Sequence, residues 1–152
     1  MGENLKIRGV YCLNLGIKRR IKNIHWIYFP EEKFPFYRIG FQSNFSPFVA
    51  PKNRTSLYIE VSYNKVIPRN IKQKILESLK EIGIKKEDID TELELLLPYA
   101  YVVYDKERER VLPEIFDFLK RNKIYTTGRF GNWEYSSMQE SVINAKKLAK
   151  NL

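Results

Sequence analysis

Apolar and polar residues alternate along several short segments of this chain, and such alternation is typical of half-buried β-strands. The clearest case is residues 55–63, in which Leu57, Ile59 and Val61 alternate with polar and aromatic neighbours. Pro98 interrupts a second alternating stretch, and we expect it to separate two strands. Strands are predicted at residues 5–17, 23–29, 36–41, 55–63, 88–97 and 99–104.

Three other segments place their apolar residues at helical spacing. The first follows Pro68 and ends at Gly83, since glycine commonly follows a helix C-terminus. The second covers residues 109–122, and the third begins after Ser136 or Ser137, either of which can cap a helix. Strands and helices in this order predict an α+β fold with a mixed, largely antiparallel sheet and about three helices.

The segment before the last helix carries the strongest sign of a binding site. Residues 124–127 predict a short strand that ends at Gly128, and a turn rich in glycine and aromatic residues leads on to the helix. A glycine turn before a helix N-terminus lets backbone amides and the helix dipole face an anion. Gly128 and Gly131 allow a close approach of the backbone, and Arg129 supplies guanidinium donors that suit a phosphate.

Composition narrows the class of protein. With 152 residues, 43% of them hydrophobic, the chain is long enough to form one domain without disulfides or metal. It shows no membrane-spanning run, no signal peptide and a single cysteine, Cys12, so we expect a cytoplasmic protein. The one histidine, His25, and the lack of a cysteine cluster argue against a zinc or thiol site. The net charge of +9 suits anionic ligands, but the basic residues are spread out apart from a triplet at 18–20.

The sequence Gly-Arg-Phe-Gly-Asn-Trp-Glu-Tyr-Ser-Ser-Met at residues 128–138, followed by a helix of small residues, resembles the C-terminal signature of FAD-dependent oxidoreductases. The amine oxidase and protoporphyrinogen oxidase-like proteins and the UDP-galactopyranose mutase group carry this signature. In that superfamily the segment leads from the substrate domain back to the FAD domain, and its helix N-terminus lies against the flavin. The resemblance implies that Gly128 and Arg129 lie beside FAD and that the backbone of Met138 and Gln139 faces its ring system.

The resemblance extends to the substrate-domain core of a prokaryotic subgroup of these enzymes. It covers residues 25–30, 35–40, 43–47, 58–62 and 98–105. It implies a fold like the C-terminal domain of FAD-linked reductases, with residues 1–123 as the substrate-binding region and residues 124–152 as the segment that would return to an FAD domain. In the mutase group an arginine of the matching strand reaches toward the substrate diphosphate, which makes Arg38 a candidate for binding an anionic substrate. Trp133 and Tyr135 would line the substrate side.

The chain lacks the Gly-x-Gly-x-x-Gly turn that holds the FAD pyrophosphate in complete members. We therefore expect the substrate-binding, flavin-covering part of an FAD-dependent, amine oxidase-like enzyme, inactive alone and binding FAD only with an FAD-binding chain in trans. A split subunit, an expressed fragment and an evolutionary remnant are all open. Amine, porphyrin-like and nucleotide-sugar substrates are open too, as is the choice between oxidation and mutase-like isomerisation.

The hypothesis of a flavin-covering part predicts an exposed apolar face that an FAD-binding chain, or a second copy of this chain, covers. A second hypothesis is a stand-alone basic module that kept the fold without catalysis and binds a polyanion or nucleic acid. That module predicts a concentrated basic patch and binding that weakens steeply as salt rises.

Overall fold

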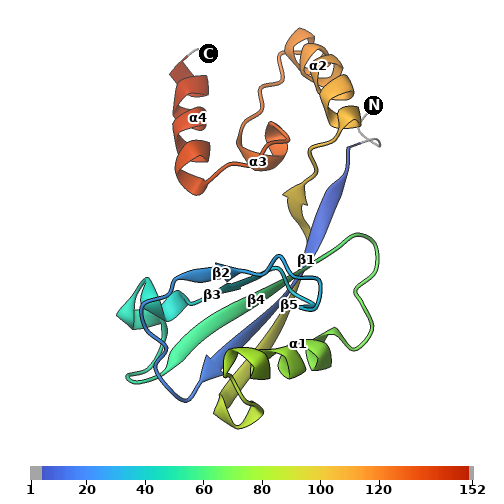
Figure 1. The fold of residues 1–152 in the computed structure, drawn as a ribbon. Coiled ribbons are helices and arrows are strands. Elements are labelled where there is room, and N and C mark those ends of the chain that lie inside the picture. Colours follow the sequence, from blue (N-terminus) through green and yellow to red (C-terminus); the bar gives the residue numbers. More distant parts are fainter. Residues whose placement is uncertain (1–4, 151–152) are drawn as a thin grey trace. The chain divides into compact units, whose positions relative to one another are not determined.

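The computed structural model describes residues 5–150, which divide into two units. The sheet unit is Gly9–Pro98, and the helical unit combines residues 5–8 with residues 99–150. Strands β1 (Ile7–Ile17) and β5 (Ile89–Val102) belong to both units, because the division falls within each of them. Figure 1 shows the elements of both units along the chain.

The strands form one sheet in the order β2-β3-β4-β1-β5. The other three members are the edge strand β2 (Trp26–Tyr28) and the inner strands β3 (Arg38–Gly40) and β4 (Thr55–Tyr63). The pairs β2–β3, β3–β4 and β4–β1 are antiparallel. Beside β1 and β5, Lys18 donates its amide to Asp88 and Val103 donates its amide to Lys6, at 2.8 and 3.0 Å, so these strands also run in opposite directions. The prediction of an α+β fold with a largely antiparallel sheet is confirmed.

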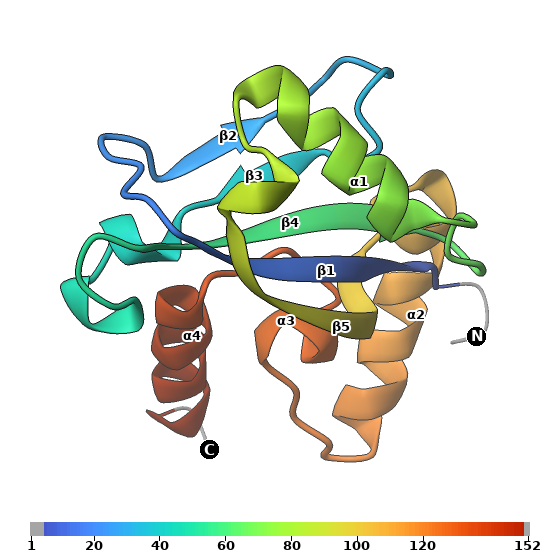
Figure 2. The same cartoon turned by 90° about the horizontal axis from the view of Figure 1, so that it is seen from below.

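The core of the sheet unit lies between one face of the sheet and helix α1 (Ile71–Leu79). Alternate residues of β1 and β4, such as Leu13 and Ile59, are fully buried against Ile75 and Leu79. Figures 1 and 2 show α1 lying along the strands. After α1 and the short η4 (Lys80–Ile82), Gly83 takes a left-handed φ of 77° and ends the helix as expected.

Short 3-10 helices complete the sheet unit. They are η2 (Gln42–Asn44), η3 (Pro47–Val49) and η5 (Lys86–Asp88). The first two lie in the phenylalanine-rich segment that the sequence predicts as a loop. The third precedes β5, whose bounds show that Pro98 does not separate two strands, so that prediction is wrong. The physical reason is that β5 is an edge strand, where the missing amide of a proline need not break the ladder to a neighbour.

The helical unit contains α2 (Lys106–Arg121), α3 (Gly128–Gly131) and α4 (Met138–Lys150). Asp105 caps α2, because its carboxylate accepts the amide of Arg108 at 2.8 Å. The turn that the sequence predicts at Gly128 is partly the four-residue helix α3. The fold has four α-helices within residues 5–150, one more than the sequence predicts. None of the helices in that range is both long enough and apolar enough to cross a membrane.

The strand predicted at residues 124–127 is wrong, because this segment is irregular. Its first residue belongs to the end of α2 instead. Lys123 adopts a left-handed φ of 56°, and the amides of Lys123 and Ile124 donate to the carbonyls of Lys120 and Leu119. This is the Schellman arrangement, which normally uses glycine where Lys123 stands. The apolar run predicts a strand by its composition. The sequence alone does not show that the backbone amide of its first residue will hydrogen-bond to the end of α2.

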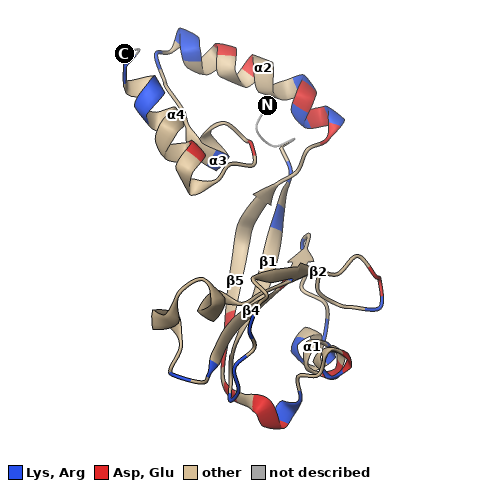
Figure 3. Ribbon diagram, turned by 60° about the vertical axis from the view of Figure 1, so that its left-hand side comes forward, with Lys and Arg blue, Asp and Glu red and all other residues tan. Residues whose placement is uncertain are grey.

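Charged residues of both signs are distributed over the elements. Figure 3 shows basic and acidic positions together along α2 and α1. Several basic side chains in the sheet unit form ion pairs with acids, including Lys33 with Glu81 at 2.6 Å and Arg54 with Asp90 at 3.1 Å. The positive net charge is therefore not concentrated in one unpaired cluster among these residues.

Candidate functional site

The N-terminus of α4 is fixed by a capping box. The Glu140 amide donates to Ser137 Oγ at 3.1 Å, and the Ser137 amide donates to Glu140 Oε2 at 2.6 Å. Ser137 is thus the cap, one of the two residues expected for that position. The box leaves the amides of Met138 and Gln139, the first two residues of α4, without an acceptor inside the helix. These two amides are what α4 can offer to an external acceptor.

The charge of Glu140 changes the kind of ligand that this helix end favours. Hydrogen bonds from the amide of Ser137, and then from its hydroxyl, lower the pKa of the Glu140 carboxyl group. Glu140 is therefore ionised at neutral pH, and its negative charge offsets the partial positive charge of the helix end. The two amides are better suited to a neutral acceptor, such as a ring carbonyl, than to a full anion.

An open hollow of about 690 Å³ lies beside the start of α4, and we call it the α4 hollow. Most of its surface is apolar, and Met138, at 89% exposed, is its most accessible side chain. Its lining consists of Tyr99, Ala100, Arg129, Phe130, Ser136, Ser137, Met138, Ser141 and Val142. The hollow therefore combines apolar walls with Met138, whose backbone amide is one of the two without an acceptor inside α4, and this arrangement suits a flat ring with polar atoms on one edge.

Arg129 lies in the wall of the α4 hollow, where two of its donors are already used. Its Nη1 donates to the carbonyl of Ala100 at 3.1 Å, and its Nη2 donates to the carbonyl of Ser136 at 3.0 Å. Its guanidinium carbon lies 5.3 and 4.9 Å from the ring centroids of Tyr101 and Tyr135, a cation–π arrangement. Arg129 thus holds β5 and the segment before α4 together, and its contact with a cofactor stays a prediction.

Gly128 is needed for its backbone conformation. Its φ of 81° lies in the left-handed region, which a side chain makes costly. It begins α3 directly after the irregular residues 124–127. The sequence predicts a close approach of the backbone to a ligand at Gly128, and this approach stays a prediction.

Trp133 and Tyr135 lie in the segment between α3 and α4. Trp133 has a φ of 49°, a left-handed conformation that costs a bulky residue on the order of 1–2 kcal/mol. Its indole Nε1 is buried and has no hydrogen-bond partner among the described residues. Tyr135 is 63% exposed, and its ring stacks on that of Tyr101 with centroids 6.2 Å apart. Tyr135 is therefore accessible to a ligand, whereas the polar atom of Trp133 is not.

The helical unit brings together six of the seven predicted site residues. These are Gly128, Arg129, Trp133, Tyr135, Met138 and Gln139. Sequence reasoning missed the residues that hold them, namely Tyr101, Tyr104 and Arg108. The one available signal was the repeated tyrosine in residues 99–105 just before a helix cap.

Arg38, the seventh residue, belongs to the sheet unit and has a partner that the sequence did not indicate. Its Nη2 lies 2.7 Å from Glu60 Oε1, and the two residues are directly opposite in the β3–β4 register. Glu60 also accepts the hydroxyl of Tyr37. The guanidinium lies over the rings of Tyr28 and Tyr58, at 5.8 and 5.5 Å from their centroids. Arg38 and Glu60 therefore form a close pair of opposite charges, and the binding of a substrate by Arg38 stays a prediction.

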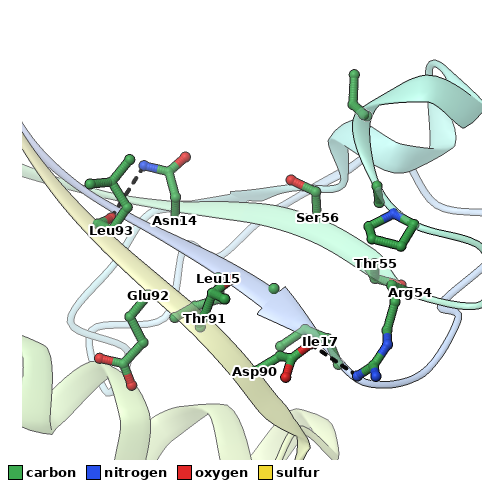
Figure 4. A pocket seen from close by; sticks show the side chains of 14 residues that line it. Asn14, Leu15, Ile17, Arg54, Thr55, Ser56, Asp90, Thr91, Glu92 and Leu93 are labelled. Carbon is green, nitrogen blue, oxygen red and sulfur yellow. Dashed lines mark hydrogen bonds and ion pairs between the residues drawn. The ribbon is translucent and has the colours of Figure 1, made fainter.

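A separate cavity of about 290 Å³ lies in the sheet unit between the ends of β1, β4 and β5. None of the predicted site residues lines it. Figure 4 shows its polar wall, in which Arg54 pairs with Asp90. The side-chain Nδ2 of Asn14 donates to the carbonyl of Leu93 at 3.4 Å. Ser56 Oγ donates to Gln42 Oε1 at 3.0 Å. Because these polar groups already contact one another, the cavity does not point to a ligand.

The described residues contain no group of three or more histidine, cysteine, aspartate or glutamate side chains that could hold a metal ion.

Comparison with known proteins shows which proteins share the fold of this chain. No family model matches the chain. The chain is similar to a UDP-galactopyranose mutase whose crystal structure is of the reduced enzyme, with a TM-score of 0.76 and 28% identity over 88% of this chain and 30% of the mutase. It is also similar in fold to a putative protoporphyrinogen oxidase from Exiguobacterium sp. 255-15, with a TM-score of 0.70 and 14% identity over 98% of this chain and 35% of the oxidase. The chain thus spans about a third of the length of each of these two proteins and shares the fold of that part.

Proposed function

We propose that this chain is the substrate-binding, flavin-covering part of an FAD-dependent oxidoreductase. The observation that carries the proposal is the similarity to the UDP-galactopyranose mutase over 88% of the chain at 28% identity. The same relationship follows from the sequence resemblance of residues 128–138. Since the chain spans 30% of the mutase, an FAD-binding chain or domain would supply the remaining functions.

The α4 hollow fits the flavin ring system. Its apolar walls suit a planar ring. The amide of Met138 in its lining, together with that of Gln139 next to it along the chain, would suit carbonyl acceptors on the edge of the ring. FAD, when bound, supplies the redox chemistry, whereas this chain supplies orientation and protection from water. In that role the two amides orient the ring edge, and the side chains of Met138 and Val142 exclude water from it.

In the helical unit, Tyr135, Trp133 and Arg129 would hold a small anionic substrate. Arg38, in the sheet unit, is a separate candidate for binding an anionic group. Tyr135 contributes an exposed ring with a hydroxyl, and Trp133 contributes the apolar part of its side chain. Arg38 contributes directional hydrogen bonds, because Glu60 already balances its charge. Discrimination between substrates would then depend on hydrogen-bond geometry more than on net charge.

An FAD-binding partner, or a second copy of this chain, would cover apolar side chains that are exposed in the sheet unit. The exposed large apolar residues of that unit include Trp26, Phe45, Leu93, Leu95 and Leu97. Trp26 and Phe45 stack on each other with centroids 5.7 Å apart, and the leucines lie on the edge strand β5. Exposed large apolar side chains that gather in this way are more common at interfaces than on monomers. The alternative of a basic polyanion-binding module has no comparable support, because the basic residues are distributed and several are ion-paired.

The test uses Met138, because proline is tolerated at the first position of a helix while it removes the backbone amide. Met138→Pro should weaken flavin binding about 3- to 10-fold, the effect of one hydrogen bond. Met138→Ala removes the same side chain but keeps the amide, so it is the matched control. Flavin absorbance retained after gel filtration is measured for the chain alone and mixed with a flavoprotein chain encoded beside it. Retention that does not differ between the two variants, or no retention by the wild-type mixture, contradicts the proposal.

A further inference from the structure

The backbone between α3 and α4 is held from outside by one residue of α2 and one residue of the segment between β5 and α2. Arg108, in the first turn of α2, donates from Nε to the carbonyl of Trp133 at 2.9 Å. Tyr104, at the end of the strand region, accepts the amide of Tyr135 at its hydroxyl, at 2.7 Å. The backbone of Trp133 and the backbone of Tyr135 are therefore each held by one long side chain.

These two contacts are joined in one assembly. The guanidinium carbon of Arg108 lies 4.1 Å from the ring centroid of Tyr104, a close cation–π contact. Arg108 thus contacts the carbonyl of Trp133 directly and supports the ring whose hydroxyl holds Tyr135. Arg108 is half-buried, and its hydrogen bond to the carbonyl of Trp133 is partly shielded from competing water, whereas Tyr104 is 59% exposed.

The position of Arg108 is itself fixed by the cap of α2. Asp105 accepts the amide of Arg108 at 2.8 Å and forms an ion pair with Lys6 at the same distance. The planar guanidinium can stack and donate in the plane at once, which the ammonium group of a lysine cannot do. The assembly therefore has a specific need for arginine.

The conformation of Trp133 shows why such an assembly is required. A left-handed backbone at a tryptophan is unfavourable and persists where neighbouring contacts fix it. Here the contact with Arg108 fixes the carbonyl of that same residue. Release of Trp133 would move the residues that follow it, which are Tyr135 and the cap of α4.

We infer that Arg108 is a positioning residue of the α4 hollow: through Trp133 and Tyr104 it sets the place of Tyr135 and of the first turn of α4. Arg108 has no described contact with Tyr135's side chain or with the amides of Met138 and Gln139, so it acts through other residues. The functional meaning of this placement rests on the proposed function, whereas the placement itself does not.

The experiment measures amide hydrogen exchange of the full chain, residue by residue. Arg108→Ala should raise the exchange rate of the Tyr135 amide at least about 5-fold, because its acceptor ring loses support. Arg110→Ala is the matched control, since Arg110 lies one position beyond Glu109 on the same helix and pairs only with Glu107 at 2.6 Å. The control should change that rate by less than about 2-fold. Equal rates in the two variants would overturn the inference.

A milder pair of variants decides the question if Arg108→Ala does not fold. Arg108→Lys keeps the charge and loses the planar group, and Arg110→Lys is its control. Faster exchange at Tyr135 in Arg108→Lys alone supports the inference, and indistinguishable rates contradict it. In flavin-loaded complexes, Arg108→Lys should also release flavin several-fold faster than Arg110→Lys at an unchanged melting temperature. Absence of flavin from the wild-type complex would count against the proposed function only, because the exchange measurement needs no flavin.

Discussion

The pair of Arg38 and Glu60 offers the sharpest test of the packing in the sheet unit. The side chains are 18% and 11% exposed, and their nearest atoms lie 2.7 Å apart. Loss of one partner from a fully buried pair costs about 3–5 kcal/mol, because the other charge is left uncompensated. Since both side chains keep some contact with water, Arg38→Met should cost about 2–3 kcal/mol and lower the melting temperature by roughly 5–10 °C.

The assay is thermal and urea unfolding followed by circular dichroism, for Arg38→Met, Glu60→Gln and the double variant. The double variant should recover about 1–3 kcal/mol relative to the sum of the single changes, since neither charge is then left alone. Lys33→Met is the control, because its pair with Glu81 is more than half exposed on both sides and should contribute less than about 1 kcal/mol. A loss in Arg38→Met no larger than in Lys33→Met would refute the reasoning.

Two further predictions concern close packing and pH. Gly40→Ala should destabilise the sheet unit by about 1–3 kcal/mol in urea unfolding, because a Cβ at this position would overlap the ring of Tyr58; unchanged stability would show that the ring moves freely. Asp105 has its pKa lowered by the hydrogen bond from Lys6 and then by the Arg108 amide. A lowered pKa in the folded state stabilises the fold at pH values above the ordinary carboxyl pKa. This stabilisation is lost as pH falls through the folded-state pKa, so the first turn of α2 should loosen below about pH 4. Nuclear magnetic resonance titration of the Arg108 amide measures this, and a midpoint at or above the ordinary carboxyl pKa would contradict it.

The regular part of the fold follows from the sequence because its signals are local. The alternation in residues 55–63 and the helical spacing before Gly83 each reflect burial on one face, and β4 and α1 lie where these patterns place them. The cap at Ser137 is equally local, since a hydroxyl and an acid three residues later form the box. Predictions failed at residues 124–127 and at Pro98, where the outcome depends on which backbone groups lie next to the segment.

The residues of the candidate site also divide into those that local sequence can predict and those that it cannot. Residues that are predicted to act through their own backbone, such as Gly128 and Met138, can be chosen from a motif. Partners that come from distant parts of the chain cannot, because pairing of Arg38 with Glu60 depends on the strand register. The same holds for Arg108, whose contact with Trp133 spans 25 residues.

The central claim is that the first turn of α4 covers a flavin. Amide hydrogen exchange of Met138 and Gln139, measured with and without the flavin-loaded partner, tests it most directly. If the ring edge accepts hydrogen bonds from these amides, their exchange should slow at least about 10-fold in the complex, while the amides of Ser137 and Glu140, already held in the capping box, should change little. Slowed exchange of all four amides alike, or of none, would contradict the account.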